Sequence, residues 1–218
     1  VSLKNFDFIV VPEHDSLTGK NVITSKGAIH YLTNYELDEN ENYLKDKIDV
    51  KKKIVCLIIG GPTKHYRYDT EIVESIFNKI ENTFIKNNYQ LIVIPSMRTP
   101  QNIIEKAQNF FDHNQIVIPN VNKKAYLSSL KISDQIIITC DSTSMISEAA
   151  FTGKPVYIAM MKPNRSIRRF KNFYTQFKEL GITKELTDNI DSWSYNRLDE
   201  VNRIAPIIKE KMKKNGII

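Results

Sequence analysis

Along most of the chain, short runs of apolar residues alternate with longer stretches in which apolar residues recur every three or four positions. The continuous runs predict strands covered on both faces, and the periodic stretches predict helices with one buried face. The predicted strands are 54–59, 91–94, 115–118, 135–140 and 155–160. Because strands and helices alternate with short connections, the pattern predicts an α/β fold: a Rossmann-like parallel sheet with right-handed crossovers and helices on both faces.

The predicted helices begin at residues that are typical of helix termini. Asp69 is expected to cap a helix whose apolar face runs from Ile72 to Phe84. Thr99 is expected to cap the next helix, with Pro100 in its first turn. Further helices are predicted over 123–130, 142–152, 166–180 and 195–214.

The first 50 residues follow this pattern less regularly. Residues 6–11 are an apolar run closed by Pro12 and predict one strand, whereas 13–24 are polar and rich in turn residues. Residues 33–50 are acidic and rich in asparagine, which predicts a linker or an exposed loop with one helical turn. We therefore expect a domain boundary in this segment. The chain also opens without Met, which leads us to expect a fragment or a trimmed start.

Charge and composition narrow the classes of partner. The chain has 31 Lys and Arg against 25 Asp and Glu, a formal charge of +6 that favours anionic partners. The basic residues are scattered apart from the clusters 51–53 and 165–171 and the C-terminal lysines, which we interpret as solvated surface. No extended basic stripe interleaved with aromatic residues is present, so we expect no nucleic acid partner. The four histidines and two distant cysteines offer no metal-ligand spacing. Cys56 and Cys140 lie in apolar runs, which indicates buried thiols in a cytoplasmic protein, and no apolar run is long enough to span a membrane.

Two of the loops that follow predicted strands contain residues suited to binding an anion. Ligands of open parallel sheets bind beyond the carboxyl ends of the strands, so these loops should meet at one edge. Gly60 and Gly61 would let backbone N–H groups approach a phosphate, although a plain turn explains them equally well. Arg98, beside Thr99, suits bidentate binding of a phosphate, and its alternative is a surface ion pair.

A third loop gives the sharpest signal. Ser142, Thr143, Ser144 and Met145 begin a helix directly after a buried strand, where hydroxyls and free N–H groups gather at the positive end of the helix dipole. Glu148 follows Ser144 by four residues, a rise of about 6 Å, and would lie beside a ribose attached to a phosphate at the helix start. The alternative is that Ser142 only caps the helix and Glu148 is a solvated acid.

Glu13 and His14 follow the first predicted strand and could face the same cleft. They are therefore our candidate catalytic residues. The alternative is that His14 caps a turn.

The run from Asp141 to Val156 resembles the signature of the mitochondrial fission ELM1-like family, whose bacterial members are described as candidate glycosyltransferases. Residues 6–15 and 21–22, the Gly60-Gly61 pair and the loop 98–100 also resemble that family. The resemblance implies a GT-B-like fold, in which two Rossmann-like domains enclose the active site. Residues 51–218 would then be the C-terminal, donor-binding half, and 1–50 the tail of an N-terminal acceptor domain plus a hinge.

The resemblance also implies an activity. By similarity to GT-B enzymes, Glu148 would bind the donor ribose. The 142–145 segment and the Gly60-Gly61 pair would bind the diphosphate. A nucleoside diphosphate sugar would be the donor, and an unknown acceptor, a glycan or a lipid-linked molecule, would receive the sugar without a metal or a tightly bound cofactor. A peripheral contact with the inner face of a membrane is compatible with this activity. The alternatives are a non-catalytic adaptor in membrane or organelle division and a nucleotide-sugar epimerase of similar architecture.

Overall fold

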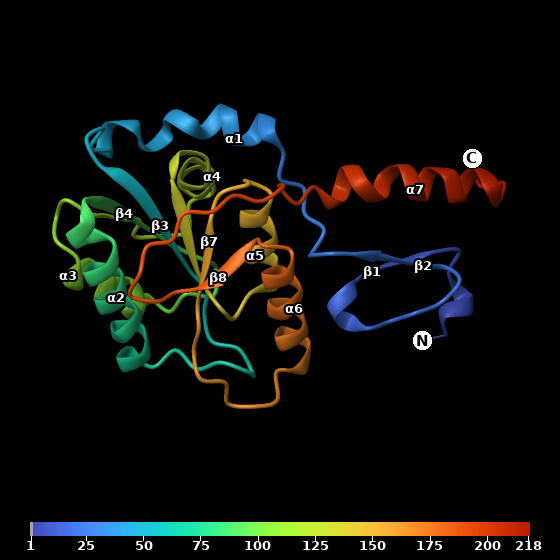
Figure 1. Cartoon of the computed structure of the whole chain (residues 1–218), viewed down its shortest axis with the longest axis horizontal. Helices are drawn as coiled ribbons and strands as arrows, with labels where there is room; N and C mark the ends of the chain where they lie inside the picture. Colours follow the sequence, from blue (N-terminus) through green and yellow to red (C-terminus); the bar gives the residue numbers. More distant parts are fainter. Residues whose placement is uncertain (1) are drawn as a thin grey trace.

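The computed structural model describes residues 2–218, and most of them build one parallel sheet with helices on both faces (Figure 1). Within that range the sheet has six strands in the order β5-β4-β3-β6-β7-β8. They are β3 (Lys53–Ile59), β4 (Tyr89–Pro95), β5 (Ile116–Val117), β6 (Gln135–Thr139), β7 (Val156–Ala159) and β8 (Thr183–Glu185). Counted along the chain this order is 3-2-1-4-5-6, the order of a doubly wound Rossmann fold. The predicted fold class is confirmed.

The crossover helices follow from the strand order. They are α2 (Thr70–Thr83), α3 (Gln101–Phe110), α4 (Lys123–Ile132), α5 (Thr143–Ala150) and α6 (Arg168–Glu179). Right-handed crossovers that run outwards in opposite directions from β3 place α2 and α3 on one face and α4, α5 and α6 on the other. β4, β6 and β7 are buried along their whole length, as their continuous apolar runs predict.

All five predicted strands of this sheet are confirmed, although β5 is only two residues long. β8 was not predicted. It lies at the edge of the sheet, and two of its three residues are exposed, so the sequence Thr183–Glu185 contains no apolar run.

Two predicted helix caps are wrong in detail. Asp69 occupies the N-cap position of α2, but its side chain makes no capping hydrogen bond. Pro100, not Thr99, is the N-cap residue of α3. The Thr99 hydroxyl instead lies 2.8 Å from the carbonyl oxygen of Ile59 and 2.7 Å from that of Gly60. Thr99 therefore ties the loop after β4 to the end of β3.

The acidic segment 33–50 is not an exposed linker. It forms α1 (Asn34–Asn40) and the 3-10 helix η3 (Glu41–Lys47), which both pack on α4. Leu37 and Leu44 are buried in the main core, and the Ser128 hydroxyl donates to the carbonyl oxygen of Glu41 at 3.0 Å. The loop interpretation failed because only these two leucines mark the buried side of a polar segment. The expected boundary therefore lies inside the sheet-containing unit.

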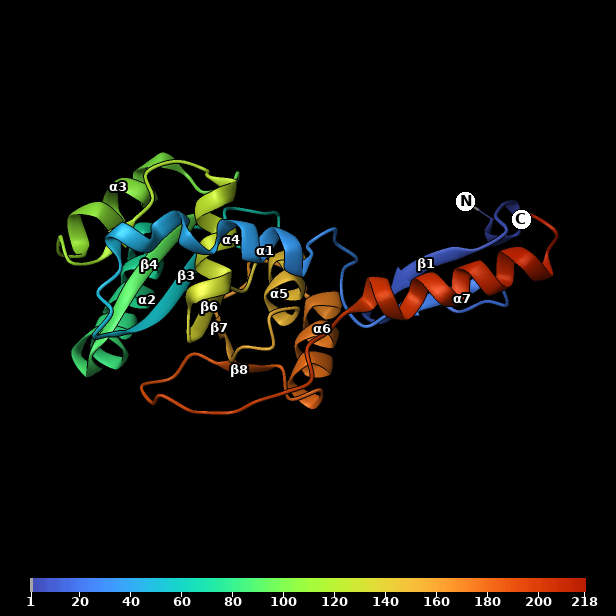
Figure 2. The same ribbon diagram turned by 90° about the horizontal axis from the view of Figure 1, so that it is seen from above.

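A small second unit projects from the main one (Figures 1 and 2). Its parallel strands β1 (Ile9–Pro12) and β2 (Val22–Ser25) pair with each other, and α7 (Glu200–Lys214) packs against β2. The 3-10 helix η2 (Glu13–Asp15) follows β1 and contacts α6 of the main unit. The chain crosses between the units near residues 26–33 and again near Asp199, so this small unit is built from both ends of the described chain.

Lys154, at the start of β7, allows a test of the main unit's stability. Its ammonium group donates to the carbonyl oxygen of Lys131 at the end of α4, and burial lowers its pKa to about 8. Since the folded pKa lies below the unfolded value, the cost of charging Lys154 is fully present below about pH 8 and fades as the pH rises towards about 10.4. We expect Lys154→Met to raise the free energy of unfolding by about 2 kcal/mol at pH 7. In urea titrations that gain should shrink between about pH 8 and 10, and a gain independent of pH would contradict the assignment.

Candidate functional site

The loops after β3, β4 and β6 meet at the carboxyl edge of the sheet, as predicted. β3 and β6 are neighbours whose crossovers leave in opposite directions, and such a switch point opens a crevice for ligands. The three loops contribute Gly61, Arg98 and Asp141, which contact one another.

A buried carboxylate connects these loops. The side chain of Asp141 is 0% exposed and accepts hydrogen bonds from the Gly61 N–H at 3.1 Å and from the Arg98 guanidinium at 2.8 Å. The hydroxyls of Thr139, at 2.7 Å, and Tyr68 also donate to it. Burial and the charge of Asp141 raise the pKa of Tyr68, which keeps its phenol protonated as a donor. Asp141 was not among the predicted site residues, although an acid directly after an apolar strand is a usable signal.

The glycine pair is closely packed in this structure. The N–H of Gly60 donates to the Thr139 hydroxyl at 2.8 Å, and that of Gly61 donates to Asp141. A Cβ on Gly60 would lie 2.1 Å from a carboxylate oxygen of Asp141, and one on Gly61 would lie 1.9 Å from the backbone oxygen of Arg98. Close approach by neighbouring loops therefore explains both glycines. Neither N–H is free for a phosphate in this conformation, so that role stays a prediction.

Arg98 forms an ion pair rather than an open phosphate site. Its guanidinium binds Asp141 at 2.8 Å and the carbonyl oxygen of Gly61 at 3.1 Å. The side chain is still 41% exposed, so part of it faces solvent at the sheet edge. The ion-pair alternative describes this structure, and phosphate binding by Arg98 stays a prediction.

The start of α5 combines a capped end with an open one. The Ser142 hydroxyl accepts the N–H of Met145 at 3.4 Å, so Ser142 is the N-cap, and Met145 packs against the core. Ser144 is exposed, and Thr143 lines a cavity. The positive end of this helix is therefore accessible through Thr143.

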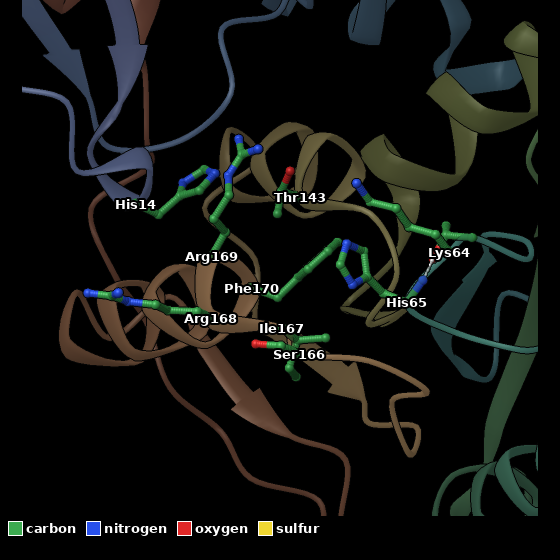
Figure 3. A pocket seen from close by; sticks show the side chains of 10 residues that line it. His14, Lys64, His65, Thr143, Ser166, Ile167, Arg168, Arg169 and Phe170 are labelled. Atoms are coloured by element: carbon green, nitrogen blue, oxygen red, sulfur yellow. Dashed lines mark hydrogen bonds between the residues drawn. The ribbon is translucent and has the colours of Figure 1, made fainter.

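That cavity, which we call the basic pocket, has a volume of about 500 Å³ (Figure 3). Four elements surround it: η2, the loop after β3, the start of α5 and the start of α6. Its described lining contains no carboxylate and consists of His14, Thr63, Lys64, His65, Thr143, Ser166, Ile167, Arg168, Arg169 and Phe170. Lys64, Arg168 and Arg169 place positive charge around one cavity, with Arg169 paired to Asp15, and this charge favours an anionic ligand.

Several of these lining residues escaped the sequence analysis. Arg168 and Arg169 begin α6, and Ser166 lies two residues before it. The sequence predicted a helix with a packed aromatic face here, and the basic cluster 165–171 was interpreted as solvated surface. A usable signal was present, because residues 149–178 contain no Asp or Glu. Lys64 and His65 follow the glycine pair, where the sequence suggests them, with Arg67, only as residues that could add positive charge to the loop. Their loop is held in place by a hydrogen bond from the Asn164 N–H to the carbonyl oxygen of His65, 2.8 Å long.

The two candidate catalytic residues lie at different positions. His14 lines the basic pocket and packs edge-on against Phe173, with its Nε2 atom 3.5 Å from Asp15. Burial lowers the pKa of His14, against the raising effect of Asp15, which favours a neutral imidazole. Glu13 does not line the pocket; it is exposed and accepts a hydrogen bond from Gln176 on α6.

Glu148 lies apart from the basic pocket. Its carboxylate accepts a hydrogen bond of 2.5 Å from the Tyr126 hydroxyl and lines a small cavity of about 60 Å³ together with His30 and Lys123. The segment before α1 covers this region, because the Ala28 N–H donates to the Ser147 hydroxyl at 2.9 Å. Glu148 is thus neither solvated freely nor open to a ribose in this conformation, and ribose binding stays a prediction.

Among residues 2–218 no group of three or more His, Cys, Asp or Glu side chains could hold a metal ion. In the same range, no helix combines the length and apolar composition needed to cross a bilayer.

The sheet order defines the class of fold, a Rossmann-like parallel sheet with helices on both faces, and similar solved structures relate it to GT-B-like folds. Similar solved structures include the UDP-GlcNAc 2-epimerase of Methanocaldococcus jannaschii in complex with UDP-GlcNAc and UDP, with a TM-score of 0.52 and 14% identity. That match covers 91% of this chain and 57% of the other. The S. aureus MnaA–UDP structure matches with a TM-score of 0.51 and 15% identity, over 94% of this chain and 56% of the other.

The sequence then identifies the family. The model of the family described as Mitochondrial fission ELM1 matches residues 1–212, so the chain belongs to this family, as the resemblance indicated. Uncharacterized protein RP120 of Rickettsia prowazekii is 29% identical over 93% of the chain, and the mitochondrial fission protein ELM1 of Arabidopsis thaliana is 24% identical over 98%. The matches span 59% and 56% of those two proteins, so this chain corresponds to little more than half of each.

Proposed function

We propose that the chain is the nucleotide-sugar-binding half of a metal-independent glycosyltransferase, with the donor diphosphate in the basic pocket. The observation that carries this proposal is the pocket itself. It lies at the carboxyl edge of a Rossmann-like sheet, beside the start of α5, and its described lining is basic without a carboxylate. Helix N-termini and cationic side chains together form sites for diphosphates.

The transfer would use groups around this pocket. The acceptor oxygen forms a bond to the anomeric carbon, the bond from that carbon to the diphosphate oxygen breaks, and the diphosphate leaves with the electron pair. The α5 terminus, Lys64 and Arg168 would stabilise the leaving charge. His14 is our candidate for the base that takes the acceptor proton, because it lines the pocket and its lowered pKa keeps it neutral.

Glu148 would bind the donor ribose in this proposal. It lies five residues after Thr143 on α5, so its Cα is about 7.5 Å further along the helix axis. The 28–30 segment would have to move to enlarge the cavity at Glu148. The carboxylate would then exchange the Tyr126 hydroxyl for ribose hydroxyls.

Calorimetric titration with UDP, GDP, ADP and their sugars tests the proposal. We expect one nucleotide to bind, and Lys64→Ala to weaken it about tenfold, the effect of losing one charge-assisted hydrogen bond. Lys51→Ala is the matched control, because it removes the same charge near the opposite end of β3. Glu148→Gln should weaken the nucleotide but not pyrophosphate, which lacks the ribose.

The outcomes separate the alternatives. If no nucleotide binds the wild-type chain, the proposal fails and the non-catalytic adaptor is favoured. The similarity in fold to UDP-GlcNAc 2-epimerases favours a second candidate, an epimerase acting on the sugar nucleotide alone. Incubation of the protein with the bound sugar nucleotide and no acceptor distinguishes it, since only an epimerase would release an epimerised sugar nucleotide.

A further inference from the structure

A second cavity adjoins the basic pocket at the start of α6. Its volume is about 370 Å³, and it is lined by Pro163, Arg165, Ser166, Ile167, Arg168, Lys171 and Asn172. We call it the α6 cavity. It shares Ser166, Ile167 and Arg168 with the basic pocket, so ligands in the two cavities would be neighbours. Figure 3 shows Arg169 pointing towards His14, whereas Arg168 extends in another direction.

The cationic side chains of the α6 cavity lack anionic partners in the protein. Arg165, Arg168 and Lys171 form no ion pair with any residue of the described range 2–218. Arg169 differs, because it pairs with Asp15 of the small unit. All three side chains are exposed, so solvent weakens their mutual repulsion, and no carboxylate of the described chain compensates the positive charge that they place around one cavity.

The start of α6 adds to the positive potential. No side chain caps this helix, and its first turn contains no acid. Arg168 and Arg169 occupy that turn, although a helix dipole favours negative charge there. The free N–H groups of an uncapped helix end need an acceptor, and none is supplied by a capping side chain. Side-chain charge and helix end therefore both favour a bound anion.

We propose that the α6 cavity binds a phosphate group carried by the acceptor, a phosphate monoester or diester. Arginine and lysine side chains with free helix N–H groups recognise phosphate oxygens, and the Asn172 amide adds a further polar group. The assignment to the acceptor rests on the proposed function, because the donor diphosphate would occupy the adjoining pocket. Phosphate binding itself does not depend on it.

The test uses the whole chain and two phosphate probes. Glycerol 3-phosphate represents a soluble ester, and vesicles of phosphatidylglycerol in phosphatidylcholine represent a lipid headgroup. We expect at least one probe to bind, and Arg165→Ala/Lys171→Ala to weaken it at least tenfold, as loss of two charge-assisted contacts predicts. Lys178→Ala on the same helix is the matched control, because Lys178 is exposed and lines neither cavity.

Titration of UDP in parallel separates this proposal from the proposed function. Arg165 and Lys171 do not line the basic pocket, so their replacement should change UDP affinity less than about threefold at physiological salt. Probe binding that persists in saturating UDP would support two adjacent sites. Binding of glycerol 3-phosphate alone indicates a soluble acceptor, and binding of the vesicles alone indicates a lipid headgroup. Binding of neither probe to the folded wild-type chain would overturn the proposal, as would an equal loss in the double variant and in Lys178→Ala.

Discussion

Asp141→Ala is expected to lower the free energy of unfolding by about 3–5 kcal/mol, because it removes a buried carboxylate that accepts four hydrogen bonds, each worth about 1.5–3 kcal/mol at most. The Asp141 side chain is fully buried and accepts hydrogen bonds from Gly61 and Tyr68 in the loop after β3, from Arg98 in the loop after β4 and from Thr139 in β6. Its removal leaves the buried Gly61 N–H without its acceptor and leaves the Tyr68 hydroxyl with only the Thr139 hydroxyl, at 2.7 Å. Urea unfolding followed by circular dichroism measures the loss.

Two further variants test whether the loss of stability comes from the hydrogen bonds to Asp141 or from the volume of its side chain. Asp141→Asn keeps the shape and one acceptor oxygen, so we expect a smaller loss than with alanine. Arg98→Ala leaves the Asp141 carboxylate, 0% exposed, without its counter-charge but with its remaining hydrogen-bond donors, so we expect it to cost about as much as Asp141→Ala. A loss below about 1 kcal/mol for Asp141→Ala would contradict the central role of this carboxylate.

The Asp141 network also bears on function. It fixes the end of β3, and the next residues along the same loop carry Lys64 and His65 into the basic pocket. The loop after β7 contacts this loop, because the Asn164 N–H donates to the carbonyl oxygen of His65. The same β7–α6 connection ends at Arg168, which also lines the basic pocket. The pocket is therefore assembled by loops that are anchored through one buried acid.

The fold was predictable because its signal is local. A strand covered on both faces must be apolar along its length, so β3, β4, β6 and β7 are visible in the sequence as continuous runs. β8 and α1 were not visible, because an edge strand and a surface helix expose most of their residues. The sequence also did not predict that both ends of the chain join the small unit, because that depends on tertiary contacts such as those between α7 and β2.

The site was predictable only as an edge of the sheet. Parallel topology brings the loops after β3, β4 and β6 together, and the structure confirms that convergence. The sequence could not show that Asp141 accepts hydrogen bonds from the Arg98 guanidinium and the Gly61 N–H, because hydrogen-bond partners are set by three-dimensional geometry. It also could not show that the start of α6 reaches the same cavity as Thr143.

Gly61→Ala is expected to lower the free energy of unfolding by about 3 kcal/mol or more, at the upper end of overpacking effects. The new methyl group would lie 1.9 Å from the backbone oxygen of Arg98, and backbone cannot rotate away as a side chain can. The loops after β3 and β4 would have to separate. Gly181→Ala is the control, because that glycine has open space around it and a φ of +70°, so it should cost only about 1–2 kcal/mol.

The Gly60→Ala variant, compared with Gly61→Ala, separates a clash with a side chain from a clash with the backbone. A methyl group there would meet the Asp141 carboxylate at 2.1 Å, not a backbone atom. In an Asp141→Ala background the cost of Gly60→Ala should therefore shrink, whereas the cost of Gly61→Ala should persist, a difference that double-mutant cycles in urea measure. Equal rescue of both glycine variants would mean that the loops move freely. The loop carrying Lys64 and His65 would then not be held by the geometry described above, and a preformed basic pocket would lose its structural basis.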